Sequence, residues 1–148
     1  MAEAVEVGVE KKRPVSGEDR RLQVVVVTPE RTALEQEADF VALPLHDGEL
    51  GVLPGRAPAI GRLGYGELRT KTGETTRRYF VDGGFVQIRD DVVTVLTSRA
   101  IAAEKIDAAA ATQELQKAEH LRAVTPEELA AKTRGVARAR AMLRVKAH

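Results

Sequence analysis

The chain has 148 residues and a formal net charge of +1, because 23 lysines and arginines nearly balance 22 aspartates and glutamates. This length suits one domain, or a small domain with an appendage, and the near-neutral charge excludes binding to nucleic acid or anionic lipid through an overall excess of cations. The absence of cysteine and of any apolar run of about 18 residues excludes disulfides, thiolate chemistry and a membrane-spanning helix.

The first 21 residues combine acidic and basic side chains with few large apolar ones. Such a segment cannot bury enough apolar surface to offset the entropy cost of ordering its backbone. We therefore expect residues 1–21 to form a flexible leader ahead of the folded part.

From Leu22 onward, the sequence has the short apolar runs and turn signals of a β domain. Leu22–Val27 is rich in β-branched residues and is followed by Thr28-Pro29-Glu30-Arg31, a turn signal. Further strands are predicted at Ala38–Leu43, which Pro44 would end, and at Glu67–Lys71, Thr75–Val81, Phe85–Ile88 and Val92–Thr97. Many short strands separated by turns predict a β sandwich or flattened barrel over residues 22–100.

Glycine and proline are concentrated between Leu43 and Gly66, which hold six of the 12 glycines and three of the six prolines. A helix there would lose about 1 kcal/mol for each glycine and about 3 kcal/mol for each proline relative to alanine. We expect turns joining very short strands in this stretch, and another tight corner at Asp82-Gly83-Gly84.

Two helices are predicted after the β domain. Asp107 caps an alanine-rich helix that extends to Ala123, with Leu115 and Ala118 on its narrow apolar stripe. A second helix begins at the capping box Thr125-Pro126-Glu127-Glu128 and continues to about Val145. Along one of its sides it places Leu129, Val136, Ala139 or Arg140, and Leu143. Residues 101–148 should therefore form an antiparallel helical hairpin, held weakly because alanine buries little apolar area.

The sequence offers no converging set of catalytic groups. His46, Asp47 and Glu49 lie close together, but a catalytic metal site needs about three protein ligands, and solvated turn residues are the simpler interpretation. The glycines near them lack the Gly-Lys-Ser/Thr of a phosphate loop, and the serines lack the local context of a nucleophile. We expect no enzyme activity, no metal and no cofactor.

The second predicted helix becomes strongly basic toward its end. From Lys132 onward it carries six cations and no acid, and Arg134 and Arg138 lie one turn apart on the same side. Part of this pattern is an ordinary solvated face, because the helix dipole favours cations near the C-terminus. The functional interpretation is a docking strip for an acidic partner, which would steer association more than anchor it.

Several motifs occur in the order typical of one protein family. The most specific is Gly48-Glu49-Leu50-Gly51-Val52-Leu53-Pro54-Gly55, preceded by Leu43-Pro44 and followed by Ala57-Pro58; the others are Val27-Thr28-Pro29-Glu30, Asp82-Gly83-Gly84-Phe85-Val86 and Val93-Thr94-Val95-Leu96. From about Leu22 to its end, the chain resembles the epsilon subunit of rotary F-type ATP synthases. It departs at Arg56, where the family usually has histidine.

This resemblance implies a non-catalytic subunit of the central stalk of a proton-translocating ATP synthase. Its expected partners are the gamma subunit, the rotor ring and the alpha and beta catalytic subunits, with membrane contact only through the complex, at the cytoplasmic face of a bacterial inner membrane. Glu49, Leu50 and Gly51 would form the ring-facing turn, while a hairpin that extends along gamma would inhibit ATP hydrolysis. The inhibitory contact with the catalytic subunits would use Lys132, Arg134, Arg138 and Arg140.

Some epsilon subunits bind ATP at an Ile/Leu-Asp-x-x-Arg-Ala motif that opens the first helix. The corresponding residues here are Ile106, Asp107, Ala110 and Ala111, so alanine replaces the arginine. Because alanine has no charged donor for phosphate, we expect weak ATP binding or none.

The alternative hypothesis is a small β-domain binding module with a basic helical tail for nucleic acid. The near-neutral net charge and the scarcity of aromatic residues, with three Phe, two Tyr and no Trp, count against it.

Overall fold

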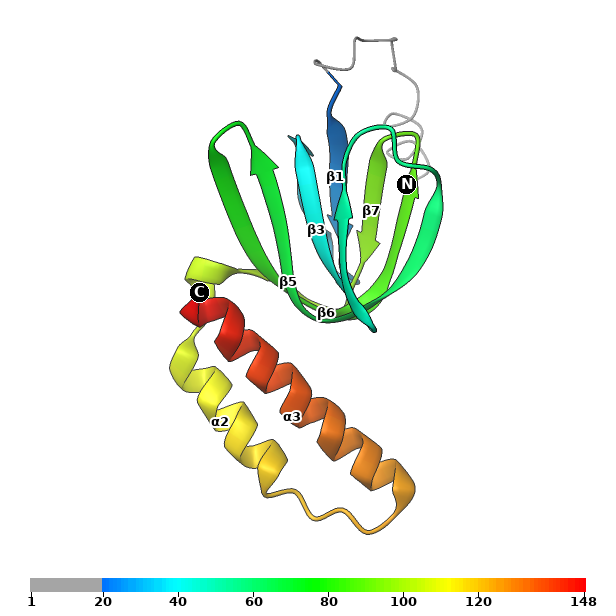
Figure 1. Ribbon diagram of the computed structural model, residues 1–148. Helices are drawn as coiled ribbons and strands as arrows, with labels where there is room; N and C mark the ends of the chain where they lie inside the picture. Colours follow the sequence, from blue (N-terminus) through cyan, green and yellow to red (C-terminus); the bar gives the residue numbers. More distant parts are fainter. Residues whose placement is uncertain (1–19) are drawn as a thin grey trace.

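The computed structural model describes residues 20–148, so residues 1–19 of the predicted leader lie outside the described residues. It contains a β sandwich with a helical hairpin beneath it (Figure 1). This confirms the predicted fold class. The strands are β1 (Leu22–Val27), β2 (Thr32–Ala38), β3 (Phe40–Leu45), β4 (Gly48–Val52), β5 (Ala59–Thr72), β6 (Thr75–Arg89), β7 (Val92–Leu96) and β8 (Ala100–Ala102); a short helix η1 (Ala103–Lys105), then α2 (Ala108–Glu119) and α3 (Pro126–Ala147) follow.

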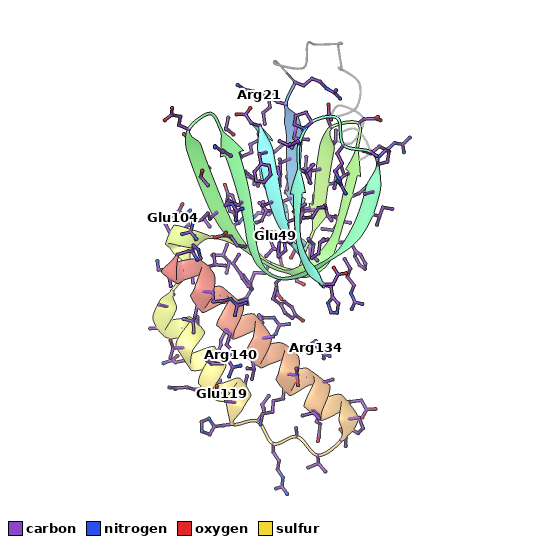
Figure 2. The ribbon with its side chains drawn as sticks, in the orientation of Figure 1. Arg21, Glu49, Glu104, Glu119, Arg134 and Arg140 are labelled. Carbon is purple, nitrogen blue, oxygen red and sulfur yellow. The ribbon has the colours of Figure 1, made fainter. Side chains whose placement is uncertain are left out.

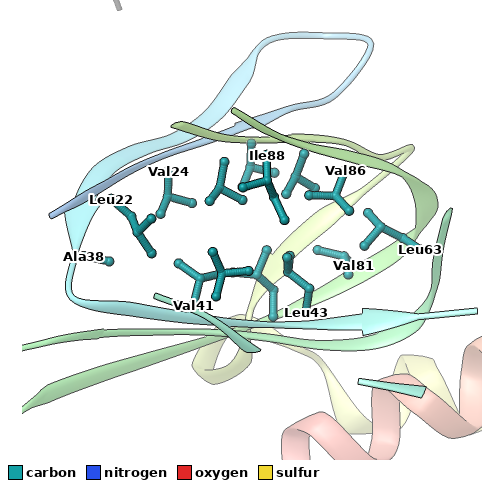
Figure 3. Packing of buried hydrophobic residues seen from close by; sticks show 14 residues of the cluster. Leu22, Val24, Ala38, Val41, Leu43, Leu63, Val81, Val86 and Ile88 are labelled. Atoms are coloured by element: carbon teal, nitrogen blue, oxygen red, sulfur yellow. The ribbon is translucent and has the colours of Figure 1, made fainter. Parts of the chain in front are cut away.

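The strands form one hydrogen-bonded sheet that folds over into two layers, in the order β2-β1-β7-β6-β5-β3-β4, with β8 paired to β6. Neighbours are antiparallel except β1 and β7, which are parallel. In β1, alternate residues are buried, as expected for a strand with one face on the core. Figure 3 shows Val24 and Ile88 in one layer facing Val41 and Leu43 in the other.

Two predictions about the early strands were wrong. β2 was not predicted, because its sequence Thr-Ala-Leu-Glu-Gln-Glu-Ala is polar, as suits an edge strand. Pro44 does not end the next strand but lies inside β3, opposite Glu49 of β4. On the other side of β3, the pairing with β5 is irregular between Ala42 and Leu45. Proline has no N–H group to donate, and Pro44 lies where the β3–β5 hydrogen-bond ladder is already interrupted, so the strand loses little by it.

The glycine-rich stretch contains a long strand as well as turns. β5 has 14 residues and includes Gly61, Gly64 and Gly66, while β6 has 15 residues and includes Gly83 and Gly84. The predicted stretch of turns and very short strands was therefore wrong from Ala59 onward. The strands tolerate these glycines because each is paired along a neighbouring strand over most of its length.

The corner predicted at Asp82-Gly83-Gly84 is a bend within β6. Gly83 and Gly84 have φ angles of +68° and +108°, yet Tyr65 pairs with Asp82 and Leu63 with Gly84 in one unbroken register. Val81 and Val86 both face the core although they are five residues apart, so β6 changes face at the bend. Ahead of it, alternate side chains therefore point out of the sandwich toward the helices.

The helical signals were interpreted correctly at their starts. Asp107 caps α2 by accepting hydrogen bonds from the Ala109 and Ala110 amides, and Thr125 forms the predicted capping box with Glu128 at the start of α3. Of the residues predicted to share one side of α3, Leu129 near its start is 57% exposed. Only the later part of α3 reaches the sandwich, since the loop end of the hairpin points away from it (Figure 1).

A second apolar cluster joins the helices to the sandwich. It centres on Phe80 of β6, which is fully buried, with Ile106, Met142 and Val145 around it. Gly135 lets the two helices approach closely, because a Cβ atom there would lie 3.2 Å from the Ala118 methyl carbon. None of the helices among residues 20–148 combines the length and apolar character that crossing a bilayer requires.

Candidate functional site

The residues predicted to face a rotor ring lie on β4, so the expectation that they form a turn was wrong. The turn is His46-Asp47, which joins β3 to β4, and Glu49, Leu50 and Gly51 follow it on the strand. Leu50 packs partly against the core, whereas the Glu49 side chain is 58% exposed. The hairpin presents the Glu49 carboxylate on a backbone held by the β3–β4 ladder.

Glu49 begins a row of alternating charges across the outer face of the sheet. Arg69 lies 3.6 Å from the Glu49 carboxylate and 3.1 Å from Glu67, whose other oxygen accepts from Arg78 at 2.8 Å. Burial raises the pKa of Glu67, but hydrogen bonds and charge from Arg78 and Arg69 outweigh it, so the net pKa lies below its ordinary value. Glu67 therefore stays ionised and holds both arginines.

The cations predicted to form one docking strip on α3 point to different surroundings. Arg138 faces the sandwich, and Arg140 lies 3.4 Å from Glu119 at the end of α2. Lys132 lines the same small groove as Arg140, while Arg134 lies on the opposite side of α3 (Figure 2). The structure thus brings Arg134 and Arg138 to one groove and Lys132 and Arg140 to another.

Arg138 is held by Asp82, which the sequence analysis placed in a corner and in a motif but did not assign to a contact with a helix. Its Nε donates to Asp82 Oδ1 at 2.8 Å, and its guanidinium lies 5.1 Å from the centre of the Tyr65 ring. The hydrogen bond to Asp82 raises the pKa of Arg138, burial lowers it, and the Asp82 charge raises it further, so the pKa lies above its ordinary value. Asp82 is only 9% exposed, and Arg99 lies 3.8 Å from its second oxygen.

A second polar contact holds the end of α3. Arg78 of β6 donates to the carbonyl oxygens of Val145 and His148, each at 2.8 Å. These carbonyls belong to the helix end, which has no further helical donors and carries the negative end of the helix dipole. Arg78 thus binds Glu67 on the sheet and the carbonyl groups at the end of α3 at the same time.

Two of the grooves beside α3 are lined by the four cations named above. One of about 590 Å³ separates α3 from the β3–β4 turn and the β6 bend, and Arg62, Arg134 and His46 line it. The other, of about 290 Å³, is mostly apolar, with Leu129 and Val136 in it and Lys132 and Arg140 at its edge. Both grooves combine hydrocarbon surface with positive charge.

A separate apolar patch lies on the outside of the sandwich. Phe85 of β6 and Leu96 of β7 are direct cross-strand partners, 56% and 51% exposed, and Ile60 of β5 is 80% exposed nearby in the same sheet. Exposed apolar side chains gathered on one sheet face are typical of surfaces that bind other proteins.

The residues matching the degenerate ATP motif all have structural roles. Ile106 and Ala111 belong to the second apolar cluster, and the Asp107 carboxylate is occupied by the Ala109 and Ala110 amides at 3.0 and 3.2 Å. The Ala110 methyl is exposed and offers no donor. Within residues 20–148, no three His, Asp or Glu side chains gather as metal ligands.

Sequence reasoning missed the residues that bind α3 to the sandwich, chiefly Asp82, Arg78 and Glu67. One signal was present: Asp82 follows the apolar pair Phe80-Val81 directly before two glycines. An acid that ends a buried strand segment needs a cationic partner. The partner itself, Arg138, is 56 residues away and has no local signature.

Comparison with known sequences identifies relatives along most of the chain. A family model described as the beta-sandwich domain of the ATP synthase delta/epsilon chain matches residues 21–103. An ATP synthase epsilon chain from Rhodopirellula baltica is 58% identical over 123 residues, covering 83% of this chain and 96% of the relative. One from Pelotomaculum thermopropionicum is 39% identical, covering 78% of this chain and 81% of the relative.

Two solved structures share the fold at low sequence identity. A chain of the Euglena gracilis mitochondrial ATP synthase superposes with a TM-score of 0.75 at 19% identity, covering 97% of this chain and 94% of that one. A chain from the Tetrahymena thermophila mitochondrial ATP synthase, central stalk and ring, gives a TM-score of 0.69 at 12% identity, covering 86% of this chain and 97% of that one. Both likenesses concern the sandwich and the hairpin together.

Proposed function

Since this chain belongs to the ATP synthase epsilon family, we propose that it couples rotation of a proton-carrying ring to ATP synthesis and restrains ATP hydrolysis. We assign it the place of the epsilon subunit in the central stalk, peripheral to an energy-coupling membrane. The observation that carries the proposal is 58% identity across 96% of an epsilon chain. We assign it no active site of its own and place it at the cytoplasmic face of a bacterial inner membrane.

The sandwich is the part proposed to bind the rotor ring and the gamma subunit. The Glu49 carboxylate, on a strand tied to its neighbours by backbone ladders, would face the polar loops of the rotor ring, with Leu50 and Gly51 shaping the hairpin. The apolar patch of Ile60, Phe85 and Leu96 would bind the gamma subunit. Rigid backbone under both surfaces supports a role in transmitting torque.

The helical hairpin is the proposed inhibitory part. Lys132 and Arg140 flank an apolar groove, and Arg134 and Arg138 lie on another side of the helix. An extended α3 would present these cations to acidic segments of the alpha and beta subunits. Exposed ion pairs contribute about 0–1 kcal/mol each, so several must act together.

The test is reconstitution of the complete ATP synthase with and without this chain. Coupling predicts that loss of the chain lowers proton-driven ATP synthesis while gamma remains bound. A chain ending at Ala102, which keeps β8 paired with β6, should support synthesis but raise hydrolysis. If the shortened chain leaves the rate of ATP hydrolysis unchanged, the proposed inhibition is wrong. If ATP synthesis is unchanged in the complex that lacks the chain, the proposed coupling is wrong.

A full-length control separates charge from loss of the hairpin. Replacing Lys132, Arg134 and Arg140 with glutamine keeps the helix and the Asp82–Arg138 contact but removes three cations. Hydrolysis should rise toward the level of the shortened chain. Replacing Arg144 and Lys117 with glutamine is the matched control and should leave hydrolysis unchanged.

We further propose that the chain binds ATP weakly or not at all. Asp107 is occupied in capping α2, and the Ala110 methyl offers no donor to a phosphate. Calorimetric titration of the isolated chain with ATP should show no micromolar affinity.

A further inference from the structure

Three alternate side chains of β6, Arg78, Phe80 and Asp82, meet α3 at three successive levels. Asp82 binds Arg138, Phe80 packs in the cluster that contains Met142, and Arg78 binds the carbonyl of Val145. Residues two apart on a strand share a face at about 6.6 Å spacing, and the helix rises about 1.5 Å per residue. The strand thus spans about 13 Å from Arg78 to Asp82 and the helix about 10.5 Å from Arg138 to Val145, lengths close enough for long side chains to bridge at both ends.

We infer that this row on β6, the latch residues Arg78, Phe80 and Asp82, holds the hairpin docked and keeps Arg138 from an acidic partner. The expected effect of the latch on ATP hydrolysis rests on the proposed inhibitory function of the helical hairpin. The docking of the hairpin on the sandwich does not depend on that function. Arg138 has one guanidinium, and it binds either Asp82 within the chain or a carboxylate outside it.

The backbone of Asp82 is held in place by hydrogen bonds. Its amide donates to Thr97 Oγ1 at 3.0 Å and to the carbonyl of Arg99 at 3.2 Å, and the bend at Gly83 and Gly84 follows it directly. A carboxylate that is 9% exposed and fixed by its backbone cannot turn to solvent, so it requires a cation nearby. In the docked state Arg138 supplies a cation at hydrogen-bond distance, with its Nε 2.8 Å from Asp82 Oδ1.

Arg99 makes the latch reversible. It precedes β8 on the sandwich, 3.8 Å from the second oxygen of Asp82, so its backbone position does not depend on α3, although its guanidinium also lies 3.9 Å from Glu114 of α2. An uncompensated buried charge would make release very costly, whereas a retained second cation reduces that cost. The contact therefore has two accessible states, with Asp82 bound to both arginines or to Arg99 alone.

The two ends of the latch have opposite charge and set the direction of α3. Asp82 meets a cationic side chain within the helix, and Arg78 meets the carbonyls at its end. If α3 ran in the opposite direction, Arg78 would face the positive end of the helix dipole and Asp82 would face its negative end, and both contacts would be repulsive. The docked orientation is therefore specified by charge as well as by the apolar cluster.

The latch is tested on the isolated full-length chain by measuring the distance between two spin labels. The chain has no cysteine, so Thr75→Cys on the β5–β6 hairpin and Ala130→Cys on α3, both exposed, are the only labelling sites. Asp82→Asn keeps the side-chain volume and removes the negative charge, and Arg138→Gln shortens the side chain and removes the positive charge. Either should raise the ratio of undocked to docked molecules about tenfold.

Matched controls exist for both substitutions. Asp90→Asn changes an exposed acid at the β6–β7 turn, and Arg144→Gln changes an exposed cation of α3, and neither residue contacts the latch. Both should leave the distance distribution unchanged. The double variant Asp82→Asn/Arg138→Gln should undock no more than either single one, because the two residues act through one contact.

The outcomes separate the latch from the proposed inhibition. If neither Asp82→Asn nor Arg138→Gln increases undocking, the latch is wrong, whatever hydrolysis does. If Asp82→Asn disturbs the sandwich, Arg138→Gln, which lies outside the sandwich, still decides the question. If both undock the hairpin and Asp82→Asn also lowers hydrolysis in the assembled complex, latch and inhibition both hold. Undocking with unchanged hydrolysis supports the latch and contradicts inhibition.

Discussion

At Gly84 the backbone has a φ angle of +108°, and a Cβ atom would lie 1.9 Å from the carbonyl oxygen of Leu96. Two independent constraints thus require glycine, the conformation of the residue and the approach of β7. Asp82, the residue before the two glycines, makes the contact to α3, so the backbone path at Gly83 and Gly84 determines where the Asp82 side chain points. Single residues here decide where larger elements meet.

Gly84→Ala should destabilise the chain by more than about 3 kcal/mol, because the new methyl forces β6 and β7 apart as well as straining the backbone. Urea unfolding at neutral pH measures the change. Gly73→Ala is the control, since Gly73 has a φ angle of +62° but no atom near its Cβ position. It should cost only about 1–2 kcal/mol for backbone strain. Equal losses in the two variants would show that the Leu96 contact is unimportant.

Glu67→Gln should reduce stability at neutral pH by at most about 1 kcal/mol, because the arginines it binds are partly exposed. The pKa of Glu67 is lowered on folding, so its contribution is complete above the ordinary value of 4.5 and is lost as the pH falls through the folded-state pKa. The difference in unfolding free energy between wild type and variant should therefore shrink below pH 4.5. A difference that grew on acidification would contradict the assignment.

At the scale of elements, the two helices are defined by different forces. α2 begins at the Asp107 cap and buries only Ala111 and Ala118, so its own contacts contribute little. α3 begins at a full capping box and ends under Arg78, so both ends have partners for their free backbone groups. α3 is accordingly the element through which the hairpin is attached.

Thr125→Ala should destabilise the start of α3 by about 1 kcal/mol, because the Glu128 amide loses its acceptor. Hydrogen exchange at the amides of Glu128 and Leu129 measures this loss directly. Thr133→Ala, within the same helix, is the control and should slow exchange slightly, since alanine has the higher helix propensity. Similar exchange in both variants would mean that the capping box contributes nothing.

At the scale of the whole molecule, residues 20–148 contain two apolar cores that meet along β6. Fourteen buried residues fill the sandwich, and seven others join η1, α2 and α3 to the outer side of the sheet. Phe80 and Val81 are adjacent but belong to different cores. This arrangement lets the hairpin leave without opening the sandwich.

Phe80→Ala should remove about 3–5 kcal/mol from the attachment of the helices, because Phe80 is fully buried among them. Amide protection should be lost in α3 while β1 and β7 keep theirs. Leu68→Ala, in the sandwich core, should instead reduce protection in all elements together. Uniform loss of protection in the Phe80 variant would contradict the division into two cores.

Local signals in the sequence determined much of this protein. The β-branched run at Leu22–Val27, the Asp107 cap and the Thr125 capping box act within a few residues of themselves, so each can be interpreted from its neighbours in the chain alone. The motif around Gly48–Val52 carried the family resemblance, which the comparisons confirm. Where glycines lie in long paired strands, as in β5, the same local reasoning predicted turns and was wrong.

Only the tertiary structure decided how the parts are joined. Asp82 and Arg138 are 56 residues apart, and Arg78 is 67 residues from Val145. Whether such residues meet depends on the bend of β6, the change of face at Gly83 and Gly84, and the length of α3. The physical reason is that caps and turns depend on neighbouring dihedral angles, whereas a buried ion pair depends on the summed geometry of every element between its partners.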